Sequence, residues 1–149
     1  MPEIQYNPTI KVRFEPLPHD PKSKWPLIQV QLSFGKLIIP QDIITLVDSG
    51  ANISIIHSDI AAALGFPKNK LKFNKGGKSV SGDYVSAVIP DKITVKIYGY
   101  EFGLNFTVID NPVLLFPCIL GENSIFQWAR LDFQKFKGFF EIKFRRDIY

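Results

Sequence analysis

Residues 43–51 read Ile-Ile-Thr-Leu-Val-Asp-Ser-Gly-Ala, an apolar run that ends in a carboxylate at the start of a polar turn. The β-branched residues predict a strand over Ile43–Val47. Asp48, Ser49 and Gly50 are typical turn residues, because Asp and Ser side chains bond nearby backbone groups and glycine tolerates positive φ. A strand that ends in this way holds Asp48 partly buried. Taken alone, Asp-Ser-Gly is a common turn composition, so the meaning of Asp48 depends on the rest of the chain.

Strand-like segments surround this stretch. Leu27–Phe34 alternates between apolar and polar residues, and Gly35-Lys36 supplies a turn, so a β-hairpin is expected to lead into Asp48. After the polar turn, residues 52–56 are again mostly apolar and β-branched. Ser58 is expected to cap a short helix over 59–64.

The second half of the chain is expected to add further strands and one more helix. The segment 71–88, with Gly76-Gly77 at its middle, predicts a long, mobile hairpin with the glycines at its tip. The other predicted elements are strands over 93–97, 102–109, 114–120, 130–133 and 139–144, and a short helix that Asn123 caps and that ends at Trp128.

The composition favours one β-rich domain. Of the 149 residues, 46% are apolar and 21% are charged, which is globular composition and excludes a disordered or collagen-like chain. The 11 prolines, 10 glycines and 13 phenylalanines are scattered among short apolar runs, whereas a helical bundle needs long segments of 3.6-residue period. Residues 1–26 are rich in proline and contain one strand-like stretch, 9–14. They are expected to form an arm with a possible edge strand before a domain over 27–149.

The residue content does not support several other classes of protein. One cysteine, Cys118, cannot form an intrachain disulfide, and two histidines are too few for a zinc module. The Cys118 thiol, among apolar neighbours, is expected to be packed and inert.

No secretory leader and no apolar stretch of about 18 residues is present, so a cytoplasmic protein without a membrane partner is expected. The net charge of +4 suggests nucleic acid as a partner, but the basic residues mostly alternate singly with apolar ones, which is typical of the solvated face of a strand.

The ordered set of features resembles the retropepsin-like aspartic peptidases, the family of the retroviral proteases and of single-domain cellular homologues. The turn at 48–51 resembles the family's Asp-Thr/Ser-Gly-Ala active-site turn, and Ile119-Leu120-Gly121 resembles its second apolar-apolar-Gly element. The hairpin around Gly76-Gly77 falls between them, where the family has its flap. The resemblance covers roughly residues 27–144. It implies a mainly β fold, the closed β-barrel of the acid proteases with two short helices and one lobe per chain.

The resemblance also implies an activity and an assembly. The family hydrolyses peptide bonds with a water held between two aspartates that share a proton. This chain has one Asp-Ser-Gly turn, so the resemblance implies a homodimer in which the Asp48 carboxylates of two subunits meet at the two-fold axis. The expected substrate is an extended polypeptide with apolar side chains beside the cut. No metal, cofactor or nucleic acid is expected.

Individual roles follow from the matching positions. Asp48 is the implied catalytic residue. Ser49 is expected to bond across the dyad to the partner's backbone, and Gly50 and Ala51 keep the turn small enough for the substrate backbone to approach. Structural support is implied for Ile119 and Gly121. The implied substrate-binding residues are Asn52, Gly76, Gly77, Ser79, Val80 and Leu120.

Two positions depart from the retroviral pattern, and other functions stay open. Retroviral members often have an Asp and an Arg where this chain has Asn52 and Glu122, which puts the contacts to the substrate ends and part of the dimer support in question. A dimeric peptide-binding module with little or no turnover is therefore the alternative, and a basic nucleic-acid-binding barrel is a third interpretation. His57 with Ser54 or Ser58 offers a hydrolase pair, but neither serine lies in a nucleophile elbow.

Overall fold

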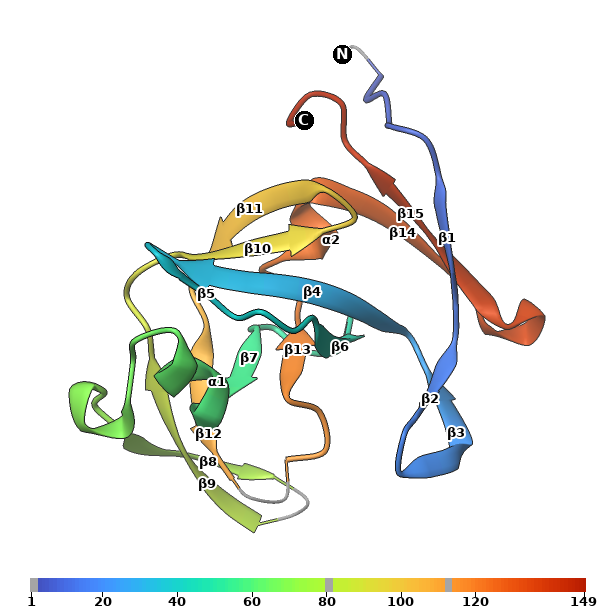
Figure 1. The fold of residues 1–149 in the computed structure, drawn as a ribbon. Helices are drawn as coiled ribbons and strands as arrows, with labels where there is room; N and C mark the ends of the chain where they lie inside the picture. Colours follow the sequence, from blue (N-terminus) through green and yellow to red (C-terminus); the bar gives the residue numbers. More distant parts are fainter. Residues whose placement is uncertain (1–2, 80–81, 112–113) are drawn as a thin grey trace.

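The computed structural model describes residues 3–79, 82–111 and 114–149, and Figure 1 shows their arrangement. Strands dominate it, which confirms the mainly β prediction. The first elements are β1 (Ile10–Arg13), β2 (Glu15–Leu17), β3 (Asp20–Trp25), β4 (Leu27–Phe34), β5 (Leu37–Ile38), β6 (Ile43–Val47), β7 (Ile55–His57), α1 (Ser58–Ala63) and the 3₁₀ turn η1 (Lys68–Lys70). They are followed by β8 (Asn74–Ser79), β9 (Gly82–Val88), β10 (Ile93–Ile97), β11 (Tyr100–Leu104), β12 (Thr107–Asp110), β13 (Cys118–Leu120), α2 (Ile125–Trp128), β14 (Ala129–Gln134), the 3₁₀ turn η2 (Lys135–Lys137) and β15 (Phe139–Phe144).

Most strands belong to one curled sheet. Its order is β11-β10-β4-β6-β13-β7-β12-β9-β8, with β5 paired to β4. Most neighbours are antiparallel, but β6 runs parallel to β13 and β7 runs parallel to β12. The sheet bends so that β10 and β11 lie at one end of the molecule and β8 and β9 lie at the other (Figure 1). Within the described ranges β11 and β8 do not pair, so the sheet of this one-lobe chain curls into a half-barrel.

The two ends of the chain meet in a second sheet of order β1-β15-β14. The strand predicted over 9–14 is confirmed as β1, an edge strand in which Ile10 pairs with Ile142 and Arg13 pairs with Phe139. Phe14, directly after β1, is buried. The N-terminal segment is therefore packed against the C-terminal strands, and both termini lie at the same end of the molecule (Figure 1). The hairpin of β2 and β3 joins this sheet to β4.

Two apolar clusters form because side chains alternate between the faces of a strand. The main core lies inside the curl, and its largest fully buried side chains include Phe106, Phe140, Phe144, Leu32 and Leu120. A smaller group, termed the second cluster, lies on the other face of β4 and β6. Its buried members are Leu17, Leu27, Leu46 and Phe116, and Trp25, Ile44 and Ile119 pack against them.

The two short helices form where predicted, but with different caps. α1 is capped by His57, whose Nδ1 accepts a hydrogen bond from the backbone N–H of the second helical residue at 3.0 Å. Ser58, the expected cap, is buried, and its hydroxyl donates to Asp110. At α2 the N-cap residue is Ser124 and not Asn123. No helix in the described part of the chain is long and apolar enough to cross a membrane.

The strand predicted over 102–109 is interrupted. β11 ends at Leu104 and β12 begins at Thr107, and the two strands pair with different parts of the sheet. Between them the side-chain amide of Asn105 donates to the carbonyl of Pro90 at 2.7 Å. This bond holds the chain where it changes partner, so the continuous prediction was wrong.

β8 and β9 form the predicted hairpin, and β9 also pairs with β12 in antiparallel orientation. Ser79 pairs with Gly82 at the last pair of the ladder. The register shifts between Lys75 and Gly77, so Gly76 lies at a bulge. The two glycines therefore lie in an arm of the hairpin. The prediction that they form its tip was wrong.

Candidate active site

Two parallel strands bring the two sequence motifs together. The apolar run 114–120 contributes only its last three residues as β13, in which Leu120 pairs with Val47 of β6. The backbone N–H of Asp48 donates to the carbonyl of Leu120 at 2.9 Å, which extends the pairing beyond the strand. Asp48 and Gly121 therefore lie side by side at the carboxyl ends of the two strands.

Asp48 is held by its own turn. Its Oδ1 accepts a hydrogen bond from the backbone N–H of Gly50 at 2.9 Å, and the N–H of Ala51 donates to the Asp48 carbonyl at 3.2 Å. The Asp48 residue is half-buried, whereas Ser49 and Gly50 are exposed. No group in the described ranges bonds Oδ2. One carboxylate oxygen is thus fixed, and the other can meet a water or a substrate.

Gly121 occupies a position that no other residue fits. A Cβ there would lie 2.3 Å from the carbonyl oxygen of Ile53 and 2.6 Å from that of Ala51. The backbone N–H of Glu122 donates to the same Ala51 carbonyl at 2.7 Å. The segment that follows Asp48 therefore passes directly against Gly121, and the missing side chain permits the contact.

The buried side chain of Ser54 joins the segment after Asp48 to the segment around Gly121, a role that the sequence did not reveal. The backbone N–H of Gly121 donates to Ser54 Oγ at 3.0 Å, and the Ser54 hydroxyl donates to Asn123 Oδ1 at 2.7 Å. Ser54 is completely buried. Its only sequence signal is a polar residue inside an apolar, β-branched run. The bond to Ser54 also explains why Asn123 does not cap α2.

A hollow of about 380 Å³ opens beside Asp48. Strand alternation places Leu46 and Asp48 on the same face of β6, so the second cluster continues into the wall of the hollow. Trp25 contributes to the same wall and packs edge-to-face on Phe116, with ring centroids 5.3 Å apart. The carboxylate thus borders a mainly apolar space that can receive an apolar side chain.

The structure places the side chains of Ile119 and Leu120 in different apolar clusters. Leu120 is fully buried in the main core, so its side chain does not reach the hollow. Ile119, expected to give structural support, is half-buried and packs against the second cluster, as Leu46 does. Because side chains alternate along β13, these two neighbours lie on opposite faces of the sheet.

The other predicted substrate-binding residues are spread over two regions. Asn52 is exposed, four residues after Asp48. Gly76, Gly77 and Ser79 lie in β8, which is separated from β6 in the sheet order by β13, β7, β12 and β9. Val80 lies outside the described residues.

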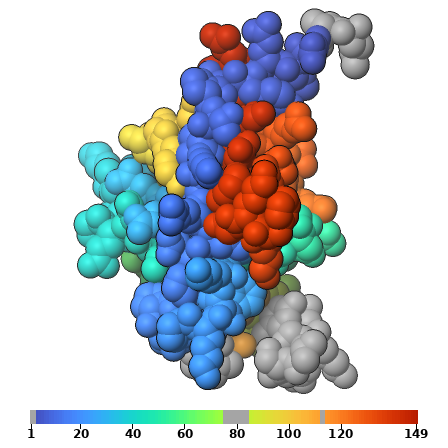
Figure 2. All heavy atoms as spheres, turned by 90° about the vertical axis from the view of Figure 1, so that its right-hand side faces the viewer, coloured from blue at the N-terminus to red at the C-terminus, as the bar shows by residue number. Residues whose placement is uncertain are grey.

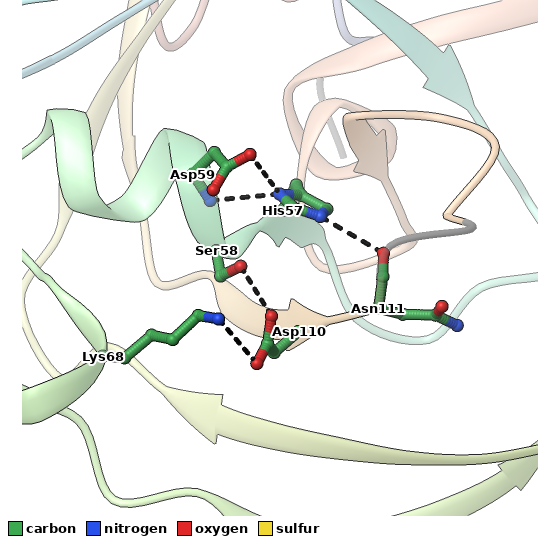
Figure 3. Close-up of polar contacts among 6 residues, drawn as sticks. All are labelled: His57, Ser58, Asp59, Lys68, Asp110 and Asn111. Carbon is green, nitrogen blue, oxygen red and sulfur yellow. Dashed lines mark hydrogen bonds and ion pairs between the residues drawn. The ribbon is translucent and has the colours of Figure 1, made fainter.

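His57 belongs to a separate polar cluster at the start of α1 (Figure 3). Its Nδ1 accepts the bond that caps the helix, so the proton resides on Nε2, which donates to the carbonyl of Asn111 at 3.2 Å. Asp59 Oδ2 lies 3.6 Å from Nδ1. Both ring nitrogens are occupied by structural bonds, which argues against His57 as the base for a serine nucleophile.

Asp110 is the carboxylate of the same cluster (Figure 3). Its side chain lies 2.9 Å from Lys68 Nζ and accepts from the Ser58 hydroxyl at 3.0 Å. The hydrogen bond from Lys68, helped by the Ser58 hydroxyl, holds the pKa of Asp110 below its ordinary value against the opposing effect of desolvation. Ser58 is therefore a bracing residue that ties α1 to the end of β12.

Cys118 is a buried and unreactive thiol. Complete burial raises the pKa of Cys118 to about 12, so the thiol stays protonated. This confirms the packed thiol that was expected. The described ranges contain no group of three His, Cys, Asp or Glu side chains placed to hold a metal ion.

Comparisons with known proteins bear on the fold. No protein-family model matches the chain, and no curated protein matches it by sequence. A crystal structure of a retropepsin-like aspartic protease from Rickettsia conorii is similar, with a TM-score of 0.61 and 16% identity over 97% of this chain and 98% of that one. The retroviral protease-like domain of Ddi1 from Leishmania major has a TM-score of 0.49 and 20% identity over 70% of this chain and 79% of that one. EIAV protease in complex with an inhibitor has a TM-score of 0.45 and 21% identity over 71% of this chain and 89% of that one.

The similarity to the Rickettsia structure extends over nearly the whole of both chains. It agrees with the curled sheet and the two short helices described above. The chain has the fold of the retropepsin-like aspartic proteases.

Proposed function

We propose that this chain is an aspartic endopeptidase that acts as a homodimer, with one Asp48 from each subunit in a shared site. The observation that carries the proposal is the setting of Asp48. Its Oδ1 is held by the N–H of Gly50, its Oδ2 has no bond in the described part of the chain, and a mainly apolar hollow adjoins it. The retropepsin-like fold supports this class of activity.

The chemistry requires two carboxylates with different protonation. One Asp48 takes a proton from a water as that water attacks the carbonyl carbon of the peptide bond, and the other, protonated, donates to the carbonyl oxygen. Two carboxylates in close contact do not both ionise, so the pair holds one proton. Each chain has one Asp-Ser-Gly turn, and a two-fold axis beside Asp48 supplies the second carboxylate. Ser49, exposed at the same turn, is available to bond the partner's backbone.

The substrate of such a site is an extended polypeptide. Its backbone would be held by strand-like hydrogen bonds between the floor of the site and the hairpin of β8 and β9, which takes the part of a flap. An apolar side chain next to the scissile bond fits the hollow, where Leu46 and Trp25 line the wall. Ile119 replaces Leu120 as the β13 residue proposed to contact the substrate, because Leu120 is fully buried.

The departures at Asn52 and Glu122 are compatible with this activity. Both residues are exposed, and neither forms an ion pair in the described ranges. A neutral Asn52 needs no cationic partner, so no Arg is required at position 122. Glu122 instead contributes its backbone N–H to Ala51.

A peptide library tests the proposal. The purified wild type is incubated with the library beside Asp48→Asn and beside Asp42→Asn, which changes an exposed aspartate just before β6 in the same way. New peptide termini are identified by mass spectrometry. Cleavage by the wild type and by Asp42→Asn, together with its loss in Asp48→Asn, is the expected result. Undiminished cleavage by Asp48→Asn would overturn the proposal, and a folded wild type that binds peptides but cleaves none would favour the binding module.

A further inference from the structure

Cationic side chains gather next to the hollow beside Asp48. A second hollow, of about 510 Å³, shares Phe14 and Lys24 with the first, so the two adjoin. Figure 2 views the face where β1 to β3 lie against the β14–β15 hairpin. The cations that line the two hollows, termed the basic track, are Lys11, Arg13, Lys24, Lys135 and Lys137. The carboxylates that line them are Asp48 and Glu15.

Three segments far apart in the sequence build the track. In β1 the exposed residues alternate with half-buried ones, which turns Lys11 and Arg13 outward. Lys24 comes from β3. Lys135 and Lys137 come from η2, after which Gly138 takes the positive φ of 80° that the tight return into β15 requires.

Within the described ranges the cations of the track are not paired with the two carboxylates that line the same hollows. None of its five cations forms an ion pair with a carboxylate there. Lys11 Nζ lies 3.9 Å from the centre of the Phe139 ring, and Lys137 Nζ lies 5.6 Å from that of Phe136, which is 86% exposed. Like charges gathered on one face raise the local positive potential and attract anions. The face thus combines unpaired cations with exposed aromatic surface.

We propose that the basic track binds acidic side chains of the polypeptide substrate on one side of the scissile bond. The preferred substrate would then carry an apolar residue in the hollow beside Asp48 and Asp or Glu residues further along the chain. This inference rests on the proposed peptidase function, because it assumes that the hollow beside Asp48 binds the substrate residue next to the scissile bond.

The arrangement of charges favours a polypeptide over a nucleic acid. The wall nearest Asp48 is largely apolar, with Leu46, Trp25 and Phe133, and suits an aliphatic or aromatic side chain. Glu15 lies in the second hollow among the cations. A phosphodiester chain carries a charge at every nucleotide and would meet Glu15, whereas a peptide with spaced carboxylates can avoid it.

Paired peptides and a charge-neutralised variant test the proposal. The peptides share one cleavage site from the library and differ only in having Asp and Glu, or Asn and Gln, at the flanking positions. The variant is Lys24→Gln/Lys135→Gln/Lys137→Gln. The matched control is Lys36→Gln/Lys70→Gln/Lys92→Gln, which removes the same charge from exposed lysines outside the two hollows.

The wild type is expected to cleave the acidic peptide with a kcat/KM about tenfold above that of the neutral one, as three exposed ion pairs would provide. The track variant should lose this preference and the control should keep it, the preference being the ratio of kcat/KM for the acidic peptide to kcat/KM for the neutral one in each protein. The preference should also shrink at high salt. Equal cleavage of both peptides by the wild type, or the same loss in the control, would overturn the proposal.

A binding measurement separates this inference from the proposed function. If the wild type cleaves no peptide, the fluorescence anisotropy of the labelled acidic and neutral peptides is measured with the wild type and the track variant. Tighter binding of the acidic peptide that the variant loses would support the track even though the peptidase proposal had failed. Equal binding of the two peptides, or tighter binding of a single-stranded oligonucleotide than of the acidic peptide, would overturn the track's assignment.

Discussion

Ser54 and Gly121 are joined by a buried hydrogen bond in which the glycine N–H donates to Ser54 Oγ at 3.0 Å. The Ser54 hydroxyl in turn donates to Asn123. One small side chain therefore joins the segment between β6 and β7 to the segment between β13 and α2. Asp48 is positioned through this contact as well as through its own turn. The geometry of the carboxylate therefore depends on a residue that touches no substrate.

Ser54→Ala should destabilise the protein and weaken catalysis. The substitution leaves the buried N–H of Gly121 without its acceptor, which costs about 1–3 kcal/mol. Urea unfolding measures this loss, and peptide cleavage should fall with it because the turn at Asp48 is loosened. The control is Ser23→Ala on the exposed strand β3, which should change stability by less than about 0.5 kcal/mol. Equal stability of the two variants would show that the Ser54 bond contributes little.

Gly121→Ala should be much more damaging than the same change at Gly103. The new methyl at 121 meets backbone oxygens, with Ile53 O at 2.3 Å, and a cost of about 3 kcal/mol or more is expected. At Gly103 the nearest atoms are 3.3 Å away and belong to the flexible side chain of Lys92, so the cost should stay near 1 kcal/mol. Thermal or urea unfolding of the two variants makes the comparison, and an equal loss would contradict the close crossing at Gly121.

Much of the fold follows from local pattern. The alternation of Leu27–Phe34 and the β-branched run Ile43–Val47 predict two strands with the bounds that the structure has. The turn at Asp48 also forms as its residue types indicate, because the Asp side chain bonds the N–H of Gly50 within the same few residues. Features that depend on neighbours in sequence are therefore visible without the structure.

The features that were missed depend on distant partners. Ser58 has the residue type of a helix cap, but its hydroxyl is taken by Asp110, 52 residues away, and His57 caps the helix instead. Which of Ile119 and Leu120 enters the main core is decided by how β13 packs in the sheet, and an apolar tripeptide carries no sign of it. The basic track escaped notice for the same reason, since three separate segments build it.

The brace around Asp110 should make stability depend on pH. The pKa of Asp110 is lowered, chiefly by the hydrogen bond from Lys68, so its contribution is present above the ordinary value of 3.8 and is lost as the pH falls through the folded-state value. Asp110→Asn should cost about 1 kcal/mol or less near pH 7, because the pair is partly exposed, and progressively less below pH 3.8.

Urea unfolding of wild type and Asp110→Asn at neutral pH and near pH 3 measures the difference. Asp91→Asn, at an exposed position, is the control and should show no such trend. A stability difference between wild type and Asp110→Asn that stays constant over this range would show that the ionised carboxylate is not what ties α1 to β12.

The most direct measurement mixes wild-type chains with Asp48→Asn chains and follows peptide cleavage at a fixed amount of wild type. If two Asp48 carboxylates share one site and subunits exchange freely, an equal amount of the variant should reduce the activity to about half, because wild-type chains become trapped in mixed dimers. Asp42→Asn chains added in the same way should cause no loss. Activity that is unchanged by added Asp48→Asn chains, after exchange has been verified with labelled subunits, would contradict a shared site and with it the proposed mechanism.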